Sequence, residues 1–324
     1  PYAVRGGPGT MLWPGRAVLR AIVEEARAQG TDKILFGTPW PLVLLGPQLR
    51  SAGLRYSVIV HGAELVVPGA IPLLRSRMAA ALGAADLLLP VSDYTGAAVV
   101  SLLQRMHVAV PRMERLRARV DTDRFHPNAS DEAVLRRYGV QPDSKVVLCF
   151  GRLVARKGVD RLIRALPQMA NEVPNVVLVV GGTGPEEKRL RKLAATTGAS
   201  VRFAGRVPDA DAPALYASAD VFALPVVDRW FGLEIEGLGV VLLEASACET
   251  PCVTGRSGGT PEAVLDGHTG FVVDASSRDD LAARIIELLR NDGLRAMMGS
   301  AARAHVQENF SAELPPQPLL DWLA

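Results

Sequence analysis

The sequence is poor in cysteine, and the spacing of its cysteines excludes two common kinds of structural site. Among 324 residues there are three, Cys149, Cys248 and Cys252, and no two of them form a Cys-x-x-Cys pair. An odd number without that spacing predicts neither a disulfide framework nor a zinc site. Because a free thiol packs as a small apolar group, we expect all three cysteines in the core.

Long apolar runs are also missing. The longest runs, such as residues 87–91 and 176–180, are far shorter than the roughly 20 residues that cross a bilayer, and they are typical of buried strands instead. The sequence does not open with a basic and then apolar leader. We therefore expect a cytoplasmic protein without a spanning helix.

The chain carries little net charge. Its 36 basic and 34 acidic residues give a formal charge of +2, and 48% of its residues are apolar. This balance is typical of a globular protein rather than a disordered one, and it does not indicate a nucleic-acid partner.

What the sequence does contain is an alternation of short apolar runs with helical patterns, which is typical of parallel sheets covered by helices. The first part predicts helices over residues 16–28 and 41–51 and strands over residues 34–36, 56–60 and 87–91. The second part predicts a doubly wound lobe with strands over residues 146–150, 176–180, 201–204, 221–224 and 252–254. The length suits two domains. We predict an α/β protein with an N-terminal lobe over residues 1–128, a C-terminal lobe over 129–310 and a tail over 311–324.

A basic loop follows the first predicted strand of the second lobe. Residues 151–158 contain Arg152 and Lys157 and have a glycine at each end. Ligands of parallel sheets bind beyond the carboxyl ends of the strands, and a guanidinium with an ammonium suits phosphate oxygens. We interpret the loop as a phosphate site, with a solvated basic loop as the alternative. The glycine-rich turn at residues 181–185 lacks the third glycine of a dinucleotide fingerprint, so it favours a tight connection.

A later segment carries two carboxylates. Glu236 and Glu244 have seven residues between them, with Gly237 and Gly239 just after the first. A helix that begins near Gly239 offers free N–H groups to a diphosphate, with Glu236 just outside the helix and Glu244 about one turn inside it. Apolar neighbours of Glu244 predict a buried carboxylate that needs a partner. A charge on the helix surface is the alternative.

The order of these motifs resembles a known family. The basic loop, the Glu236 and Glu244 pair, and segments 251–253 and 258–262 are similar to the retaining GT-B glycosyltransferases of family four. The resemblance covers about residues 54–310 and implies two Rossmann-like lobes. Residues 230–239 and 121–125 are most similar to the actinobacterial phosphatidylinositol monomannoside mannosyltransferases within that family. This implies a hexosyltransferase that uses GDP-mannose as donor and a phosphatidylinositol mannoside lipid as acceptor.

The resemblance also implies roles for individual residues of the second lobe. Arg152 and Lys157 would hold the donor diphosphate and stabilise the leaving nucleoside diphosphate, without a metal or other cofactor. Glu236 would hold the sugar and its phosphate, together with the backbone of Gly237, Leu238, Gly239 and Val240. Glu244 would bind the ribose hydroxyls, and the backbone of Val207 would contact the base.

In the first lobe, His61 begins a His-Gly-x-Glu segment that the resemblance places near the sugar. The implied catalytic group is therefore His61, Arg152, Lys157 and Glu236, for transfer with retention at the anomeric carbon. Residues 121–123 and 209–211 have the spacing of an Asp-x-Asp metal motif. The first lies between the lobes and the second begins a helix, so we expect both to cap local structure rather than hold a metal.

A lipid acceptor implies contact with a membrane surface, such as the inner face of the plasma membrane. Six arginines offer cationic contacts to anionic lipid: Arg75, Arg77, Arg112, Arg115, Arg117 and Arg119. A solvated face is the alternative.

Three parts of the sequence depart from the family pattern. The opening strand, glycine-rich loop and helix of the N-terminal lobe are not recognised, so we expect an incomplete lobe, and residues 117–120 lack the residues usual before the Val-Asp pair. Residues 313–318 are rich in proline where a final helix would return to the first lobe. Alternative functions are transfer from another donor or to a small polar acceptor, epimerisation of a nucleotide sugar, and binding of a nucleotide sugar without transfer.

Overall fold

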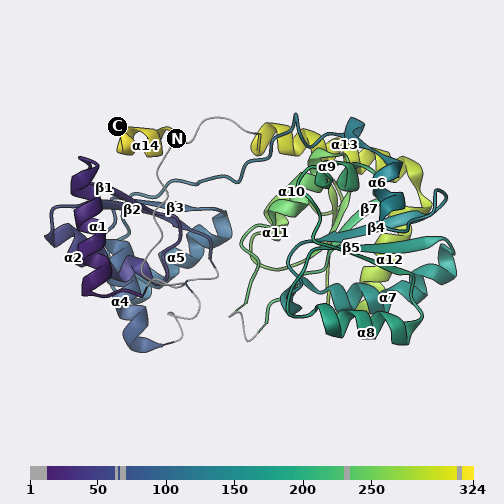
Figure 1. Ribbon diagram of the computed structural model, residues 1–324, viewed down its shortest axis with the longest axis horizontal. Helices are drawn as coiled ribbons and strands as arrows, with labels where there is room; N and C mark the ends of the chain where they lie inside the picture. Colours follow the sequence, from purple (N-terminus) through teal and green to yellow (C-terminus); the bar gives the residue numbers. More distant parts are fainter. Residues whose placement is uncertain (1–12, 63–64, 66–70, 230–233, 312–315) are drawn as a thin grey trace. The chain divides into compact units, whose positions relative to one another are not determined.

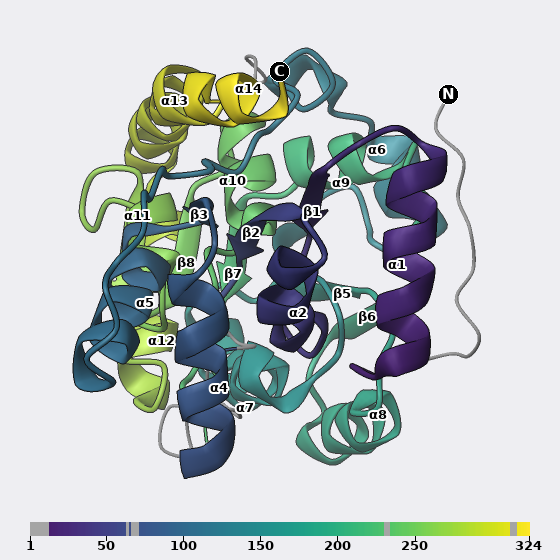
Figure 2. The same cartoon turned by 90° about the vertical axis from the view of Figure 1, so that its left-hand side faces the viewer.

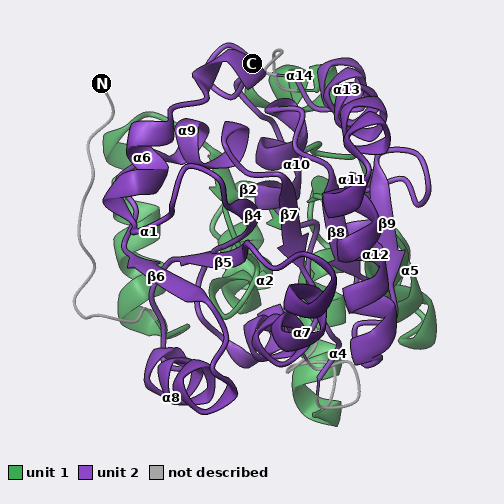
Figure 3. Ribbon diagram, turned by 90° about the vertical axis from the view of Figure 1, so that its right-hand side faces the viewer, with its two compact units in different colours: residues 1–117, 314–324 green, residues 118–313 purple. Residues whose placement is uncertain are grey.

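The chain folds into two compact units. The computed structural model describes residues 13–62, 65, 71–229, 234–311 and 316–324. One unit comprises residues 1–117 and 314–324, and the other comprises residues 118–313 (Figure 3). Each is an α/β structure built on a parallel sheet, as the alternation of apolar and helical patterns predicts.

The division between the units differs from the boundary that we placed near Asn128. The backbone N–H of Val120 donates to the carbonyl of Phe310 at 2.8 Å, and the ring of Phe125 is buried in the core of the second unit. Residues 118–128 therefore belong to the second unit, because their apolar side chains complete its core.

Within the described residues, the first unit contains a three-stranded parallel sheet in the order β1-β2-β3. Its strands are β1 (Lys33–Phe36), β2 (Arg55–Val60) and β3 (Leu87–Pro90), and its helices include α1 (Arg16–Ala28), α2 (Gly46–Ser51), α4 (Pro72–Gly83) and α5 (Asp93–Arg105). Figure 2 shows these helices arranged around the sheet. The helix predicted over residues 41–51 is a 3-10 turn (Leu42–Leu45) followed by α2. Pro47 stands in the first turn of α2, where its missing N–H is tolerated.

The end of the chain is helical and packs on the first unit. Helix α14 (Gln317–Leu323) begins directly after Pro316, so the prolines of this segment precede or open the helix rather than prevent it. Trp322 donates its indole N–H to Asp86 at 3.1 Å, and it packs with Leu319 against Leu87 and Leu89. The tail is therefore part of the first unit and not a separate segment.

The second unit has, among its described residues, a six-stranded parallel sheet in the order β6-β5-β4-β7-β8-β9 (Figure 1). The strands are β4 (Lys145–Phe150), β5 (Val176–Gly181), β6 (Val201–Gly205), β7 (Val221–Leu224), β8 (Cys252–Gly255) and β9 (Gly270–Val273). The five strands predicted from the sequence are confirmed, and β9 was missed. The order reverses direction between β4 and β7, which makes that point the topological switch of a doubly wound sheet.

Helices cover both faces of this sheet. Helices α7 (Val159–Glu172), α8 (Glu187–Thr197) and α12 (Arg278–Arg290) lie on one side, whereas α9 (Ala212–Ala217), α10 (Val240–Ala247) and α13 (Asp292–Asn309) lie on the other (Figures 1 and 3). The shorter helices α6 (Glu132–Arg137) and α11 (Thr260–Ala263) complete the unit with 3-10 turns at Pro127–Ala129 and Ala155–Lys157. Strands β5 and β7 are buried along their whole length, which explains their continuous apolar sequences.

The three cysteines lie in the core of the second unit, as predicted. Cys149, Cys248 and Cys252 are free thiols and are each buried. Burial raises the pKa of each thiol to about 12, so they pack as neutral apolar groups. None of the helices in the described ranges combines the length and apolar character needed to cross a bilayer.

Candidate functional site

Two loops of the second unit bring opposite charges together at the carboxyl edge of its sheet. Lys157 follows β4, and its Nζ lies 2.9 Å from Oε2 of Glu236, which follows β7. Arg156 donates from Nη1 to the same carboxylate oxygen. Lys157 and Glu236 are each only 8% exposed. Because these loops flank the topological switch between β4 and β7, the charges lie where parallel sheets bind their ligands.

The position of Lys157 depends on a glycine that follows it. The 3-10 turn Ala155–Lys157 ends at Gly158, whose φ is +70°. A Cβ atom at this position would lie 2.1 Å from the carbonyl oxygen of Pro225, so a larger residue would displace the loop that follows β7. Gly158 thus permits this tight turn and fixes where Lys157 enters the site.

The second glycine-rich turn is a tight connection, as predicted. A Cβ atom on Gly182 would lie 1.9 Å from the carbonyl oxygen of Gly151, and one on Gly184 would lie 2.3 Å from that of Leu153. The turn after β5 therefore packs directly against the basic loop after β4. Its glycines allow the backbone of this turn to pack closely against the backbone of the basic loop.

Of the two arginines in the basic loop, Arg156 rather than Arg152 contacts the carboxylate of Glu236. The side chain of Arg152 is exposed, and across the described residues it forms no hydrogen bond or ion pair. Arg156, which we did not select, joins Lys157 on Glu236. Its only signal in the sequence is its position next to Lys157, because its carboxylate partner is 80 residues further along the chain. Whether Arg152 binds the diphosphate stays a prediction.

The backbone of Glu236 is held by the loop that follows β8. The N–H of Glu236 donates to the hydroxyl of Ser257 at 3.1 Å, and its carbonyl accepts from the N–H of Gly259 at 3.1 Å. Gly258 has a φ of +53°, and a Cβ atom there would lie 1.8 Å from the carbonyl oxygen of Glu236. Gly258 and Gly259 therefore position the carboxylate of Glu236. This contact was not predicted from the sequence.

Helix α10 begins beside this carboxylate. Gly239 is its N-cap with a φ of +83°, and no side chain of the described residues caps the helix start. The side chain of Val240 is 43% exposed, whereas Leu238 is buried. The first turn therefore leaves backbone N–H groups and a partial positive charge that favour an anion. The predicted helix start near Gly239 is confirmed, whereas Trp230 to Leu233 of the preceding motif lie outside the described residues.

The second carboxylate, Glu244, has one described hydrogen-bond partner. It is half-buried on α10, and its Oε2 accepts a hydrogen bond from the hydroxyl of Tyr216 at 2.7 Å. Burial raises the pKa of Glu244, and the Tyr216 hydrogen bond and the charge of Arg124 offset only part of that effect. The carboxylate predicted to need a partner therefore has one, and that partner comes from α9.

The two remaining predicted residues, Val207 and His61, belong to different units of the chain. Val207 follows β6 and is buried, with its side chain near Gly181 at the end of β5. His61 belongs to the first unit, where its Nε2 lies 2.9 Å from the carbonyl oxygen of Gly37. Glu64 of the same segment lies outside the described residues. The roles of Val207 toward the base and of His61 toward the sugar stay predictions.

The two Asp-x-Asp segments have local structural roles, one of them different from the role predicted. Asp121 accepts from the backbone N–H groups of Asp123 and Arg124 at 3.1 and 3.0 Å, which is the capping predicted for it. Asp211 stands before α9, but its carboxylate instead accepts from Arg137 at 3.0 Å and Tyr138 at 3.4 Å. It thereby ties α6 to α9. In the part of the chain that the structure describes, no group of three or more His, Cys, Asp or Glu residues is placed to hold a metal.

The fold and the order of the motifs are those of a known class of enzymes. The structure is similar to HepE of Anabaena crystallised with UDP and glucose, with a TM-score of 0.79 and 22% identity over 95% of this chain and 81% of that one. At this identity the likeness shows the fold, which is GT-B as predicted. A model of the family described as "Glycosyl transferases group 1" matches residues 130–305. The chain therefore belongs to the group 1 glycosyltransferases.

Two curated relatives narrow the comparison. One is the GDP-mannose-dependent alpha-(1-6)-phosphatidylinositol monomannoside mannosyltransferase of Mycolicibacterium smegmatis, which is 40% identical over 95% of this chain and 80% of its own length. The other is the GDP-mannose-dependent monoacylated alpha-(1-6)-phosphatidylinositol monomannoside mannosyltransferase of Corynebacterium glutamicum, which is 36% identical over 99% of this chain and 84% of its own length. Both belong to the branch of the family that residues 121–125 and 230–239 indicate.

Proposed function

We propose that this chain transfers mannose from GDP-mannose to a phosphatidylinositol mannoside lipid, with retention at the anomeric carbon. The two relatives support the donor and the acceptor. The geometric observation that carries the proposal is the cluster at the carboxyl edge of the second unit, where Lys157 and Arg156 meet Glu236 beside the uncapped start of α10. Cations and free N–H groups suit a diphosphate, and carboxylates suit sugar hydroxyls.

In this proposal the leaving GDP is stabilised by charge. Negative charge develops on the departing phosphate during transfer, and preorganised cations stabilise such charge most effectively in a site that excludes water. Lys157 is already held in place by Glu236, whereas the exposed Arg152 is available to meet the diphosphate from the same loop. We propose that these cations and the start of α10 act in place of a metal. Glu236 then binds sugar hydroxyls, and Glu244 binds the ribose.

We further propose that the enzyme contacts the cytoplasmic face of the membrane through the start of α4. Ile71 and Leu73 are 46% and 62% exposed there, and Arg75 and Arg77 follow them in the same helix. Exposed apolar side chains next to cations suit a surface of anionic lipid. Sedimentation with vesicles tests this: binding should need anionic lipid and weaken in Leu73→Ser. Equal binding to neutral vesicles would contradict it.

Calorimetric titration of the purified chain with GDP and UDP tests the donor. We expect micromolar binding of GDP, much weaker binding of UDP, and loss of GDP binding in Arg152→Ala because a diphosphate contact is removed. Preference for UDP would contradict GDP-mannose as donor. Assays with GDP-mannose then separate the reactions, since transfer requires the lipid acceptor. Conversion of the donor without acceptor would indicate an epimerase instead.

A further inference from the structure

The phenol of Tyr216 is buried next to the carboxylate of Glu244. Its ring is 0% exposed and packs against Phe125, Phe150 and Phe222, with centroid distances of 5.9, 5.7 and 5.5 Å. A phenylalanine would fill the same space and make the same ring contacts. The packing therefore accounts for an aromatic ring at this position but not for its hydroxyl group.

The hydroxyl has a specific partner in Glu244. Tyr216 Oη donates to Glu244 Oε2 at 2.7 Å, a short bond that is strengthened by the charge of its acceptor. Within the described ranges, the carboxylate of Glu244 accepts no other hydrogen bond. One oxygen is therefore anchored from the core, and the other stays available at the half-buried surface of α10.

Other charged groups also face Glu244. Arg124, from the segment of the second unit that precedes α6, lowers its pKa, whereas Asp209, from the loop before α9, raises it. Arg124 is itself held by a hydrogen bond from Nη2 to the carbonyl of Asp209 at 2.5 Å. Cys248, one turn along α10, is a buried neutral thiol. Of the residues around Glu244, Tyr216 is the one whose hydrogen bond fixes the direction of the carboxylate.

We infer that Tyr216 is a positioning residue that sets the preference of this site for a ribose over a deoxyribose. Its hydroxyl anchors one oxygen of Glu244, so that the other oxygen faces the vicinal hydroxyls of the donor's ribose. This inference rests on the proposed function, because it takes Glu244 as the ribose ligand. Without the anchor, the carboxylate samples other rotamers and loses part of its hydrogen bonding to those hydroxyls.

Calorimetric titration of the full chain with GDP and 2′,3′-dideoxy-GDP tests the inference. We expect the wild type to bind GDP at least about tenfold more tightly, as for one hydrogen bond to a charged group. Tyr216→Phe should lose most of this preference by weakening GDP while leaving dideoxy-GDP unchanged. In transfer assays its KM for GDP-mannose should rise about tenfold with kcat nearly unchanged. In a chain that already carries Glu244→Ala, Tyr216→Phe should cause no further loss.

Tyr138→Phe is the matched control. Its hydroxyl also donates to a carboxylate, that of Asp211 at 3.4 Å, but this pair joins α6 to α9. We expect the control to bind both nucleotides like the wild type. A Tyr216→Phe variant that keeps the preference, or that weakens both nucleotides equally, would overturn the inference while leaving the proposed function intact. A wild type that binds neither nucleotide would overturn both.

Discussion

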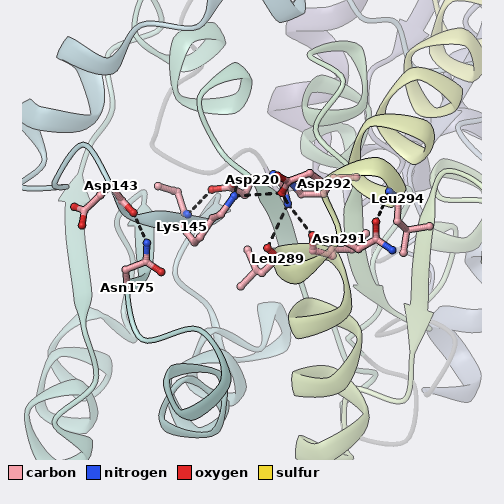
Figure 4. Close-up of polar contacts among 11 residues, drawn as sticks. Asp143, Lys145, Asn175, Asp220, Leu289, Asn291, Asp292 and Leu294 are labelled. Atoms are coloured by element: carbon pink, nitrogen blue, oxygen red, sulfur yellow. Dashed lines mark hydrogen bonds and ion pairs between the residues drawn. The ribbon is translucent and has the colours of Figure 1, made fainter.

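The two edges of the sheet in the second unit both carry clusters of opposite charge, and they differ in how those charges are satisfied. At the amino edge, Asp220 accepts hydrogen bonds from Lys145 and from the backbone of Val146, and it also pairs with Arg295 (Figure 4). Arg295 also pairs with Asp292, at 2.7 Å. Each charge in this network has several partners, and the network ties β4 and β7 to α13.

At the carboxyl edge, two cations have one acidic partner among the described residues. Lys157 and Arg156 share a single carboxylate, Glu236, beside a helix start that no side chain caps. The amino edge, in contrast, adjoins a cavity of about 400 Å³ lined by residues such as Ser218 and Asp220. A cavity between charges that already satisfy each other does not by itself indicate a ligand. Incomplete pairing next to a helix start is the better indication of a site.

The strongest test of this comparison replaces one lysine at each edge. We expect Lys157→Met to reduce the rate of mannose transfer by about 100-fold or more, because it removes a cation that meets the developing charge. Lys145→Met should leave the rate nearly unchanged and lower the free energy of unfolding, because it removes a partner of Asp220 and Asp292. Initial rates and urea denaturation of both variants measure these effects. Equal loss of activity in the two variants would contradict the distinction between the edges.

A glycine substitution tests whether the carboxyl edge depends on exact placement of Glu236. In Gly258→Ala the new methyl group would collide with the carbonyl of Glu236, so we expect the transfer rate to fall about tenfold or more. Gly198→Ala is the control, since it has a similar positive φ but no atom within 4 Å of its Cβ position. The control should be destabilised by about 1 kcal/mol and keep its rate. A similar rate for both variants would show that the loop after β8 does not position Glu236.

The smallest expected effect is a difference in how the two edges respond to pH. The pKa of Glu244 is raised above its usual 4.5 by burial, whereas hydrogen bonding and the charge of Arg295 lower the pKa of Asp292 below its usual 3.8. Acidification should therefore protonate Glu244 first and weaken GDP-mannose binding several-fold. The contribution of Asp292 to stability is complete above about pH 4 and is lost only as the pH falls through its lowered value.

Titrations with GDP-mannose at successive pH values, with circular dichroism on the same samples, check this order. The variant Glu244→Gln should flatten the dependence of binding on pH, since it removes the titrating group. Loss of the folded signal before loss of binding would contradict the expected sequence of events.

Only part of the carboxyl-edge site could be predicted from the sequence. The spacing of Glu236 and Glu244, the basic loop and the start of α10 near Gly239 follow from neighbouring residues, and the structure contains each of them. Arg156, Tyr216 and Ser257 were missed, because each acts on a carboxylate from a different segment of the chain. Strand β9 was also missed, although it is as long as β7 and β8.

The sequence by itself determined the α/β class, most of the strands and the family, since these depend on local apolar periodicity and on motifs read along the chain. The tertiary structure alone decided which charges meet, which carboxylate Tyr216 anchors, and that α14 belongs to the first unit through Trp322 and Asp86. Hydrogen bonds and ion pairs act over a few ångströms in space. Residues far apart in the sequence become partners only when the order of the strands and the packing of the helices bring them together.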